Sequence, residues 1–399
     1  MNKEDFPILL NNKNLVYLDS SATSLKPKQV IDEINNYYNF YTANLHRGDY
    51  DNAITVNKKV EETRVLVKEF LNAKEENEII FTSGTTESLN MIVFSFMKYN
   101  LKENDEVLLT KTEHASNVLP WLVLEREIGI KVKYIPLKEN LTIDYEKLEE
   151  IINDNTKVIS IAHITNTVGD IREINKIRDI INNKNIYFVV DGAQSAGHIK
   201  VDVEESNIDF YAFSGHKMYA DTGIGVLYAK KDLLEKMRPF KYGGGMNDTY
   251  TIEEYSLKQV PYKFDAGTVN ISGILSLRAA VEYINNIGIE NITNYISNLS
   301  NFLYENLKNV KNIKIYNDNF HTGIMIFNID KVFSQDLSLF LNKYNICVRS
   351  GNHCSKLLKD FILISNTCRI SLNIYNTKED ILKLVEALNK QEEIYENII

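Results

Sequence analysis

Short apolar runs that end in small or polar residues recur through the middle of the chain. Each is followed by a stretch with helical spacing, and the runs lie at residues 78–88, 105–116, 157–166, 186–195 and 208–217. Apolar runs of four or five residues are typical of strands buried on both faces, and their alternation with helices predicts a mostly parallel sheet in an α/β domain. Ligands of such sheets bind beyond the carboxyl ends of the strands. The polar residues at those ends are therefore the candidates for a functional site.

Helices are predicted on both sides of this core. Apolar residues recur at helical spacing in two sets, which are Val56, Val60, Val67, Phe70 and Leu71, and Leu299, Phe302, Leu303, Leu307 and Val310. Thr377 followed by Asp380 resembles a capping box that opens a last helix, "KEDILKLVEALNK".

The alternation of strands and helices thins out past about residue 285. A long helix, two strands ("GIMIFNID" and "YNICVRSG") and a closing helix follow. This order predicts a smaller α+β domain at the C-terminal end. We expect residues 16–284 to form the large domain, and residues 1–15 with 285–399 to form the small one.

Composition narrows the classes of function. The chain has 399 residues with a formal net charge of -9. Nucleic-acid and anionic-membrane surfaces require clustered Lys and Arg, and no such cluster is visible. The N-terminal residues do not resemble a signal peptide, and apolar runs are too short to cross a membrane. We expect a cytoplasmic protein with no nucleic-acid or membrane partner.

The three cysteines are Cys347, Cys354 and Cys368. Their odd number and the lack of C-x-x-C spacing suggest neither a disulfide framework nor a metal site. A free cysteine usually behaves as a small buried hydrophobe. Cys354 instead lies in "VRSGNHCSKL", where almost nothing apolar surrounds it.

The strand-end residues are weak signals one by one. A lysine such as Lys217, just after a strand, is most often a surface charge. Asp191 at a strand end is typical of a helix N-cap, and a histidine such as His114 is more often structural than catalytic. A turn such as "SGTTES" can simply cap a helix.

Together these residues make up the parts of a pyridoxal phosphate site. Gly84, Thr85 and Thr86 at a helix start suit a phosphate, which Ser214 and His216 can approach from another strand end. Lys217 can form a Schiff base with an aldehyde, Asp191 can hold a proton on a pyridine nitrogen, Gln194 can face the phenolate oxygen, and His114 can stack on the ring.

At this point the chain resembles a known family, the SUF-type (group II) cysteine desulfurases, in the class V group of fold type I pyridoxal phosphate enzymes. The most specific elements are "SGHK" and R-x-G-x-H-C. The resemblance runs nearly end to end, through "YLDSSATSLKP", "NLHRGDY", "FTSGTTES", "EHASNVLPW", "HITNTVGD", "VDGAQSAGH", "DFYAFSGHKMY", "TGIGVLY", "FDAGTVN", "VRSGNHC" and "CRISLNIYNT".

The resemblance implies a role for each site residue. Lys217 is the Schiff-base lysine, Asp191 pairs with the pyridinium nitrogen, and His114 stacks on the ring. By the same resemblance, Gln194 and Asn166 lie near the ring oxygen and the substrate, and Arg369 binds the substrate carboxylate. His46 and Arg349 line the same pocket. The phosphate is bound by Thr85, Thr86, Ser214 and His216. Thr268 matches the residue that reaches the phosphate of the neighbouring subunit, which implies a homodimer with shared active sites.

By the same resemblance Cys354 is the nucleophile. The thiolate is the reactive species, and nearby cations favour it. Arg349 and His353 are candidate sources of positive charge, and a loop containing Gly351 can swing between the cofactor and an outside acceptor. Cys347 alternates with apolar neighbours and Cys368 ends a strand-like run, so both are interpreted as structural.

The implied reaction converts L-cysteine to L-alanine and passes the sulfur, as a persulfide on Cys354, to a small acceptor or scaffold protein of iron–sulfur cluster assembly. Alternatives of the same fold are a selenocysteine lyase, a cysteine sulfinate desulfinase or an aminotransferase. The alternative from another class is a subunit that binds the cofactor but has lost catalysis. Such a subunit would lack Lys217, Cys354 or Arg369, and all three are present, which counts against it.

Four positions depart from the family pattern. Ala115 and Asn352 stand where a histidine is common, Asp221 lies in "YADTG" in place of Gly-Pro, and Val269 replaces a proline. The first two reduce the supply of protons near the cofactor. The others are expected to alter loop rigidity or cofactor affinity, and none removes a residue that the reaction needs.

Overall fold

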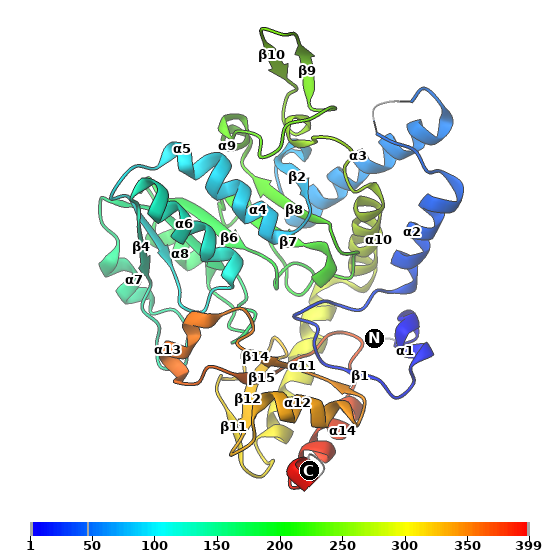
Figure 1. The fold of residues 1–399 in the computed structure, drawn as a ribbon, viewed down its shortest axis with the longest axis vertical. Coiled ribbons are helices and arrows are strands. Elements are labelled where there is room, and N and C mark those ends of the chain that lie inside the picture. The colour runs from blue at the N-terminus through cyan, green and yellow to red at the C-terminus, as the bar shows by residue number, and fades with distance from the viewer. Residues whose placement is uncertain (1–2, 46–47, 397–399) are drawn as a thin grey trace.

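A computed structural model describes residues 3–45 and 48–396 of the chain. Its larger part is built on a seven-stranded sheet, shown in the upper half of Figure 1. Only β8 runs antiparallel to its neighbours, so the prediction of a mostly parallel α/β sheet is confirmed. The strands, in sheet order, are β2 (Ile79–Thr82), β8 (Gly225–Ala229), β7 (Phe210–Ser214), β6 (Tyr187–Asp191), β5 (Thr156–Ala162), β3 (Glu106–Leu109) and β4 (Lys131–Tyr134).

Helices cover both faces of this sheet. Successive side chains of β5 point to opposite faces, and Val158 and Ile159 belong to two separate buried clusters. This is why the central strands are apolar on both faces rather than alternating, whereas the edge strand β4 alternates. The covering helices are α2 (Lys28–Phe40), α3 (Asp51–Leu71), α4 (Thr85–Met91), α5 (Lys98–Asn100), α6 (Leu119–Ile128), α7 (Tyr145–Ile151), α8 (Ile174–Ile180), α9 (Lys231–Lys236) and α10 (Ile271–Ile287), with a π-helical stretch at Ile92–Met97 joining α4 to α5.

A smaller antiparallel sheet lies below the first in Figure 1. Its strands, in order, are β11 (Ile313–Ile315), β12 (Ile324–Ile329), β15 (Thr367–Ser371) and β14 (Arg349–Gly351). The helices around it are α11 (Ile289–Leu307), α12 (Ser334–Asn342), α13 (Lys359–Ile362), α14 (Lys378–Leu388) and α15 (Glu393–Glu396). The predicted capping box of Thr377 and Asp380 at the start of α14 is confirmed.

Two details of the C-terminal prediction are wrong. The stretch "YNICVRSG" forms two short strands in different sheets: β13 (Ile346–Cys347) pairs with β1 (Val16–Tyr17), whereas β14 joins the smaller sheet. Cys368 does not end a strand; it is the second residue of β15 and is fully buried.

The N-terminal segment contacts both parts of the molecule. Phe6, just before α1 (Pro7–Asn11), packs its ring against Tyr219 and Tyr283 near the larger sheet, whereas Val16 and Leu18 belong to the buried cluster of the smaller sheet. The exact division of the chain into domains remains a prediction.

A hairpin of β9 (Asn247–Tyr250) and β10 (Tyr255–Leu257) projects from the top of the molecule in Figure 1. Among the described residues, no helix combines the length and the apolar character that crossing a bilayer requires.

Candidate active site

The carboxyl ends of the central strands open into a cavity of about 200 Å³. Asp191 is the last residue of β6, Ser214 is the last residue of β7, and Lys217 lies in the 3-10 turn that follows β7. The smaller sheet contributes Arg349 and Arg369, which are register partners across β14 and β15. The described residues that the sequence placed in the site and that line this cavity are Thr85, Thr86, His114, Asn166, Asp191, Gln194, Ser214, His216, Lys217, Arg349 and Arg369.

Asp191 and Lys217 form the electrostatic centre of the cavity. Asp191 is 4% exposed, and its Oδ1 accepts a hydrogen bond of 2.9 Å from the backbone N–H of Ala193. Burial raises the pKa of Asp191 to about 6. Burial likewise lowers the pKa of Lys217 to about 8, although Asp191 opposes that shift. A sizeable fraction of the Lys217 amine is therefore neutral, and thus nucleophilic and basic, near neutral pH.

His114 is an uncharged imidazole in this site. Burial lowers its pKa to about 4, and the nearby Lys217 adds to the effect. Its Nδ1 accepts a hydrogen bond of 3.1 Å from the backbone N–H of Ser116, which leaves the proton on Nε2. A neutral ring held from one edge can lie against a flat ligand.

Hydroxyl groups gather at the end of the cavity where α4 begins. The backbone N–H of Thr85 donates to Ser214 Oγ at 2.8 Å, and the hydroxyls of the same two residues lie 2.8 Å apart. Thr86 Oγ1 similarly pairs with Ser116 Oγ at 2.8 Å. A helix start with converging hydroxyl donors suits a phosphate group. His216 also lines this cavity, and burial lowers its pKa to about 4.

The amide side chains of the site also connect neighbouring segments. Gln194 Nε2 donates to the backbone oxygen of Ser21 at 2.9 Å. Asn166 Nδ2 donates to the backbone oxygen of His353 at 2.7 Å, and its Oδ1 accepts from Ser355 Oγ at 3.2 Å. Asn166 therefore ties the large sheet to the loop of Cys354.

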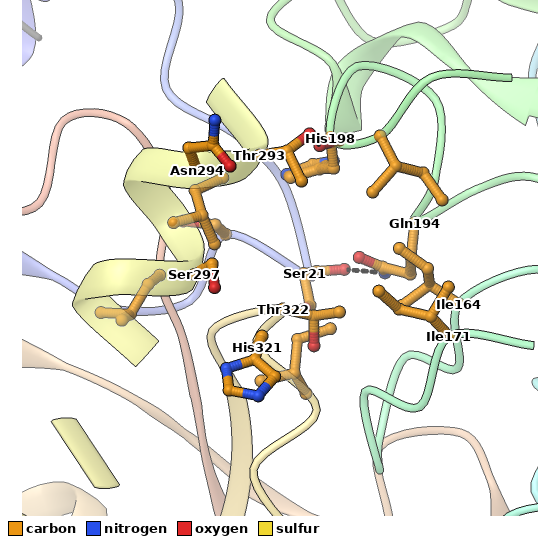
Figure 2. Close-up of a pocket in the computed structure, with 15 residues that line it drawn as sticks. Ser21, Ile164, Ile171, Gln194, His198, Thr293, Asn294, Ser297, His321 and Thr322 are labelled. Atoms are coloured by element: carbon orange, nitrogen blue, oxygen red, sulfur yellow. Dashed lines mark hydrogen bonds between the residues drawn. The ribbon is translucent and has the colours of Figure 1, made fainter. Parts of the chain in front are cut away.

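A second cavity of about 130 Å³ shares Ser21 and Gln194 with the first, and Figure 2 shows the hydrogen bond between these two residues in its lining. Ile164 lines both cavities. The remaining wall comes largely from α11 and from the loop before β12, including Thr293, Ser297, His321 and Thr322.

The loop of Cys354 is held in place by its backbone. Gly351, His353 and Cys354 all have positive φ angles, of 118°, 52° and 60°. The backbone oxygen of Cys354 accepts from the N–H of Ala115 at 2.8 Å, and its own N–H donates to Asn352 Oδ1 at 3.0 Å. The sequence predicts a loop that can swing between the cofactor and an outside acceptor, and the structure shows this loop tethered to Ala115, with a half-buried thiol.

The source of positive charge near Cys354 also differs from the prediction. Arg349 Nη2 lies 3.7 Å from Cys354 Sγ. His353 is 3% exposed, and burial beside Arg369 and Arg349 lowers its pKa to about 3. His353 is therefore neutral, and the suggestion that it supplies positive charge is wrong. Of the two candidates, only Arg349 supplies that charge.

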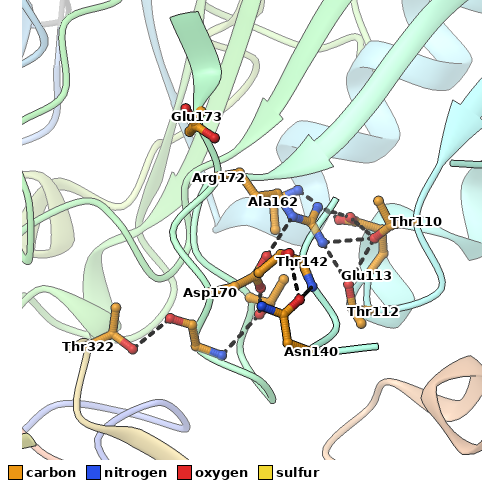
Figure 3. Close-up of polar contacts among 12 residues, drawn as sticks. Thr110, Thr112, Glu113, Asn140, Thr142, Ala162, Asp170, Arg172, Glu173 and Thr322 are labelled. Atoms are coloured by element: carbon orange, nitrogen blue, oxygen red, sulfur yellow. Dashed lines mark hydrogen bonds and ion pairs between the residues drawn. The ribbon is translucent and has the colours of Figure 1, made fainter. Parts of the chain in front are cut away.

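A buried ion cluster behind the cavity has no counterpart in the sequence analysis (Figure 3). Arg172 is 2% exposed and pairs with Glu113 and with Asp170. Glu113 Oε2 in turn accepts from the backbone N–H of Ala162 at 2.8 Å. Glu113 precedes His114 and Ala162 lines the cavity, so the cluster braces two of its walls. No sequence signal marks this group, because its members meet only in the fold.

Two described residues that the sequence placed in the site, Thr268 and Cys354, are not among those that line this cavity. Thr268 is exposed and lines a separate hollow near the end of β2, where its hydroxyl accepts from Asn44 Nδ2 at 3.3 Å. His46 lies outside the described residues. Cys347 is half-buried in β13.

The side chains present fit pyridoxal phosphate. Arg369 Nε and His353 Nδ1 are buried and have no hydrogen-bond partner among the described residues. The cavity places an amine at one wall, a buried carboxyl group at another, and hydroxyl donors at a helix start. These are the groups that an aldehyde, a pyridine nitrogen and a phosphate require.

Comparison with known proteins identifies the family of the chain. The aminotransferase class-V family model matches residues 16–384. A probable cysteine desulfurase of Halalkalibacterium halodurans is 38% identical over 399 residues, with 99% of this chain and 98% of the relative covered.

Solved structures agree as well. The cysteine desulfurase CsdA from Escherichia coli superposes with a TM-score of 0.92 at 32% identity, covering 99% of each chain. The cysteine desulfurase from Thermococcus onnurineus gives 0.93 at 33% identity, covering 98% of this chain and 96% of the other.

The fold and the site together define a fold type I pyridoxal phosphate enzyme. The chain belongs to the class V aminotransferase family, in its cysteine desulfurase group, which confirms the family recognised from the motifs.

Proposed function

We propose that this protein is a pyridoxal-phosphate-dependent cysteine desulfurase that converts L-cysteine to L-alanine and holds the sulfur as a persulfide on Cys354. The observation that carries the proposal is the shared cavity of Lys217, Asp191 and Arg369. Arg349 lines that cavity and lies 3.7 Å from the Cys354 sulfur, so a thiol is available beside the amino-acid site.

Pyridoxal phosphate, when bound, supplies an electron sink for negative charge at the substrate Cα. Lys217 would hold its aldehyde, and the Asp191 carboxylate would keep its ring nitrogen protonated. His114 would lie against the ring. The phosphate would be held by Thr85, Thr86, Ser214 and His216, and the ring-oxygen side by Gln194 and Asn166.

Arg369 is suited to the substrate carboxylate. Its guanidinium is buried, and it is oriented by Asp19 Oδ1 at 2.8 Å and by the backbone oxygen of Asn166 at 2.9 Å. Its Nε has no hydrogen-bond partner among the described residues, so this donor can bind an incoming carboxylate. This arrangement fixes the amino acid by its carboxylate end.

Lys217 moves the proton at the substrate Cα. Its neutral amine can take this proton, because burial lowers the pKa of Lys217 to about 8. The resulting ammonium can return a proton to the carbon skeleton. The neutral His114 can donate from its Nε2–H, because its Nδ1 already accepts from the Ser116 N–H.

Cys354 takes the sulfur. Its thiolate, stabilised by Arg349, attacks the substrate Sγ and forms an S–S bond. The electron pair of the breaking Cβ–Sγ bond goes to the substrate Cβ. This carbon then takes up a proton, which gives alanine. The persulfide remains on Cys354.

The sulfur then passes to an acceptor or scaffold protein of iron–sulfur cluster assembly. The enzyme acts as a homodimer with shared active sites, in which Thr268 reaches the phosphate bound to the neighbouring subunit. The exposure of Thr268, away from the cavity of its own chain, supports this arrangement.

A direct assay tests the function. Purified protein loaded with pyridoxal phosphate is given L-cysteine and a thiol reductant, and alanine and sulfide are measured. We expect equal amounts of both from the wild type and neither from Cys354→Ser. Release of selenide from selenocysteine by a wild type that leaves cysteine untouched would instead identify a selenocysteine lyase.

A further inference from the structure

The segment from Asp19 to Lys26 belongs to the motif "YLDSSATSLKP", to which the resemblance gives no role. The structure shows that it contacts three site residues. Asp19 Oδ1 accepts from Arg369. The Ser21 backbone oxygen accepts from Gln194, as Figure 2 shows. The third contact is made with the turn that carries Lys217.

That contact converges on one atom, the backbone oxygen of His216. It accepts from the Ser24 N–H at 2.9 Å, Ser24 Oγ at 3.1 Å, Thr23 Oγ1 at 3.1 Å and Lys26 Nζ at 3.0 Å. A carbonyl oxygen has two lone pairs, so four donors make this an unusually concentrated contact. The His216 carbonyl belongs to the peptide that joins His216 to Lys217.

Lys26 is the charged member of this set. Its ammonium has three N–H groups and three acceptors, at 2.7 Å to the Ser24 oxygen, 3.0 Å to the His216 oxygen and 3.4 Å to Thr23 Oγ1. Hydrogen bonds from a charged donor are stronger than neutral ones. Burial lowers the pKa of Lys26 to about 8, with Asp221 acting against the shift.

The turn is also fixed on its other sides. The Gly215 N–H donates to the Ile224 oxygen at 2.9 Å, and the Tyr219 N–H donates to Ser24 Oγ at 2.7 Å. The Lys217 backbone is thus held between β8 and the N-terminal segment, while its long side chain remains free to turn. A flexible side chain reaches its reacting partner reliably only when its backbone is fixed.

We propose that Lys26 is a positioning residue for Lys217: its ammonium, with Thr23 and Ser24, clamps the His216 carbonyl so that Lys217 is presented to the cofactor aldehyde. The inference rests on the proposed function in one respect: it takes Lys217 as the residue that binds the cofactor. Lys26 does not line the cavity and touches neither cofactor nor substrate.

The test follows the attachment of the cofactor and needs no substrate. Apoprotein is mixed with pyridoxal phosphate, and the growth of the visible absorbance of the lysine-linked cofactor is timed. Borohydride then fixes the linkage, and mass spectrometry of the peptide measures its yield at Lys217. The variants are Lys26→Met and, as the matched control, Lys28→Met, because Lys28 lies two residues on, is exposed and pairs only with Asp32 among the described residues.

We expect Lys26→Met to slow attachment at least about tenfold and Lys28→Met to leave it unchanged. Lys26→Ala should behave like Lys26→Met, and Lys26→Arg, which keeps a charged donor, should retain much of the rate, which a general loss of stability would not produce. Equal rates for Lys26→Met and wild type would overturn the proposal.

A second variant decides the matter if Lys26→Met does not fold. Thr23→Val removes one of the four donors and keeps the shape of the side chain, so slower attachment supports the clamp and unchanged attachment rules it out. A wild type that attaches the cofactor at Lys217 but releases no alanine from cysteine contradicts the proposed function alone, and the comparison of Lys26 with Lys28 still stands.

Discussion

Arg349 is the first residue of β14, and its Nη2 lies 3.7 Å from the Sγ of Cys354, which lies in the stretch between β14 and α13. Of the two cations that the sequence suggested, the guanidinium of Arg349 is the one beside this sulfur, since burial lowers the pKa of the neighbouring His353 to about 3. The reactivity of the thiol should therefore depend on Arg349 and not on His353.

Replacing Arg349 should slow the chemistry of Cys354. We expect Arg349→Gln to reduce the rate of iodoacetamide alkylation of Cys354 at pH 7 by roughly tenfold, because a cation about 4 Å from a thiolate stabilises it by a few kcal/mol at most in a partly exposed site. Arg349→Lys should keep much of the rate. His353→Gln serves as the control. An effect of His353→Gln as large as that of Arg349→Gln would mean that the charge assignment is wrong.

Removing the charge of Asp191 should impair the reaction without preventing cofactor binding. Asp191→Asn keeps the size of the side chain but cannot hold a proton on the ring nitrogen as an ion pair. We expect alanine release to fall by about two to three orders of magnitude while visible absorbance of the bound cofactor persists. The control is Asp209→Asn, a buried carboxylate just before β7 that bonds the Phe188 N–H. Near-normal turnover in Asp191→Asn would contradict the role of Asp191.

Loss of Arg172 should destabilise the protein strongly. Arg172→Met leaves Glu113 buried without its partner, which typically costs about 3–5 kcal/mol. The measurement is the urea midpoint of the apoprotein, together with its affinity for pyridoxal phosphate, since Glu113 braces the wall next to His114. The double variant Arg172→Met with Glu113→Gln should recover part of the stability. An Arg172→Met protein as stable as the wild type would show that the cluster is not structural.

His163 should make stability depend on pH. Its Nδ1 is buried without a partner among the described residues, and burial lowers its pKa from 6.5 to about 4. The unfolded chain therefore binds a proton before the folded one does, so the stabilisation is complete above pH 6.5 and is lost as the pH falls toward 4.

Between pH 7 and pH 5 this single histidine should cost about 2 kcal/mol of folding free energy. Unfolding of the apoprotein at the two pH values, for wild type and His163→Gln, measures it. The variant should show a shallower loss of stability on acidification. An identical loss in both proteins would contradict the shifted pKa.

The sequence predicts the main sheet because burial on both faces leaves a local signal. Val158 and Ile159 face opposite clusters, so apolar residues stand side by side in β5 and the strand is visible in the sequence. The meeting of Asp191, Ser214 and Lys217 is predictable as well, since parallel strands bring their carboxyl ends to one edge.

Features that depend on distant partners are not predictable in this way. The stretch "YNICVRSG" forms two strands because Ile346 pairs with Val16, which lies near the other end of the chain. The charge of His353 depends on its burial beside Arg369, and the tether of Cys354 depends on Ala115. None of these contacts leaves a trace in the local sequence.

The sulfur on Cys354 is the most direct test of the whole account. The loaded enzyme is incubated with L-cysteine carrying isotopically labelled sulfur, without reductant, and the peptide that contains Cys354 is analysed by mass spectrometry. We predict one labelled sulfur atom added to Cys354 in the wild type, and none on the peptides of Cys347 and Cys368. Labelled persulfide on the Cys354→Ser variant, or alanine release by the wild type with no labelled sulfur on Cys354, would contradict it.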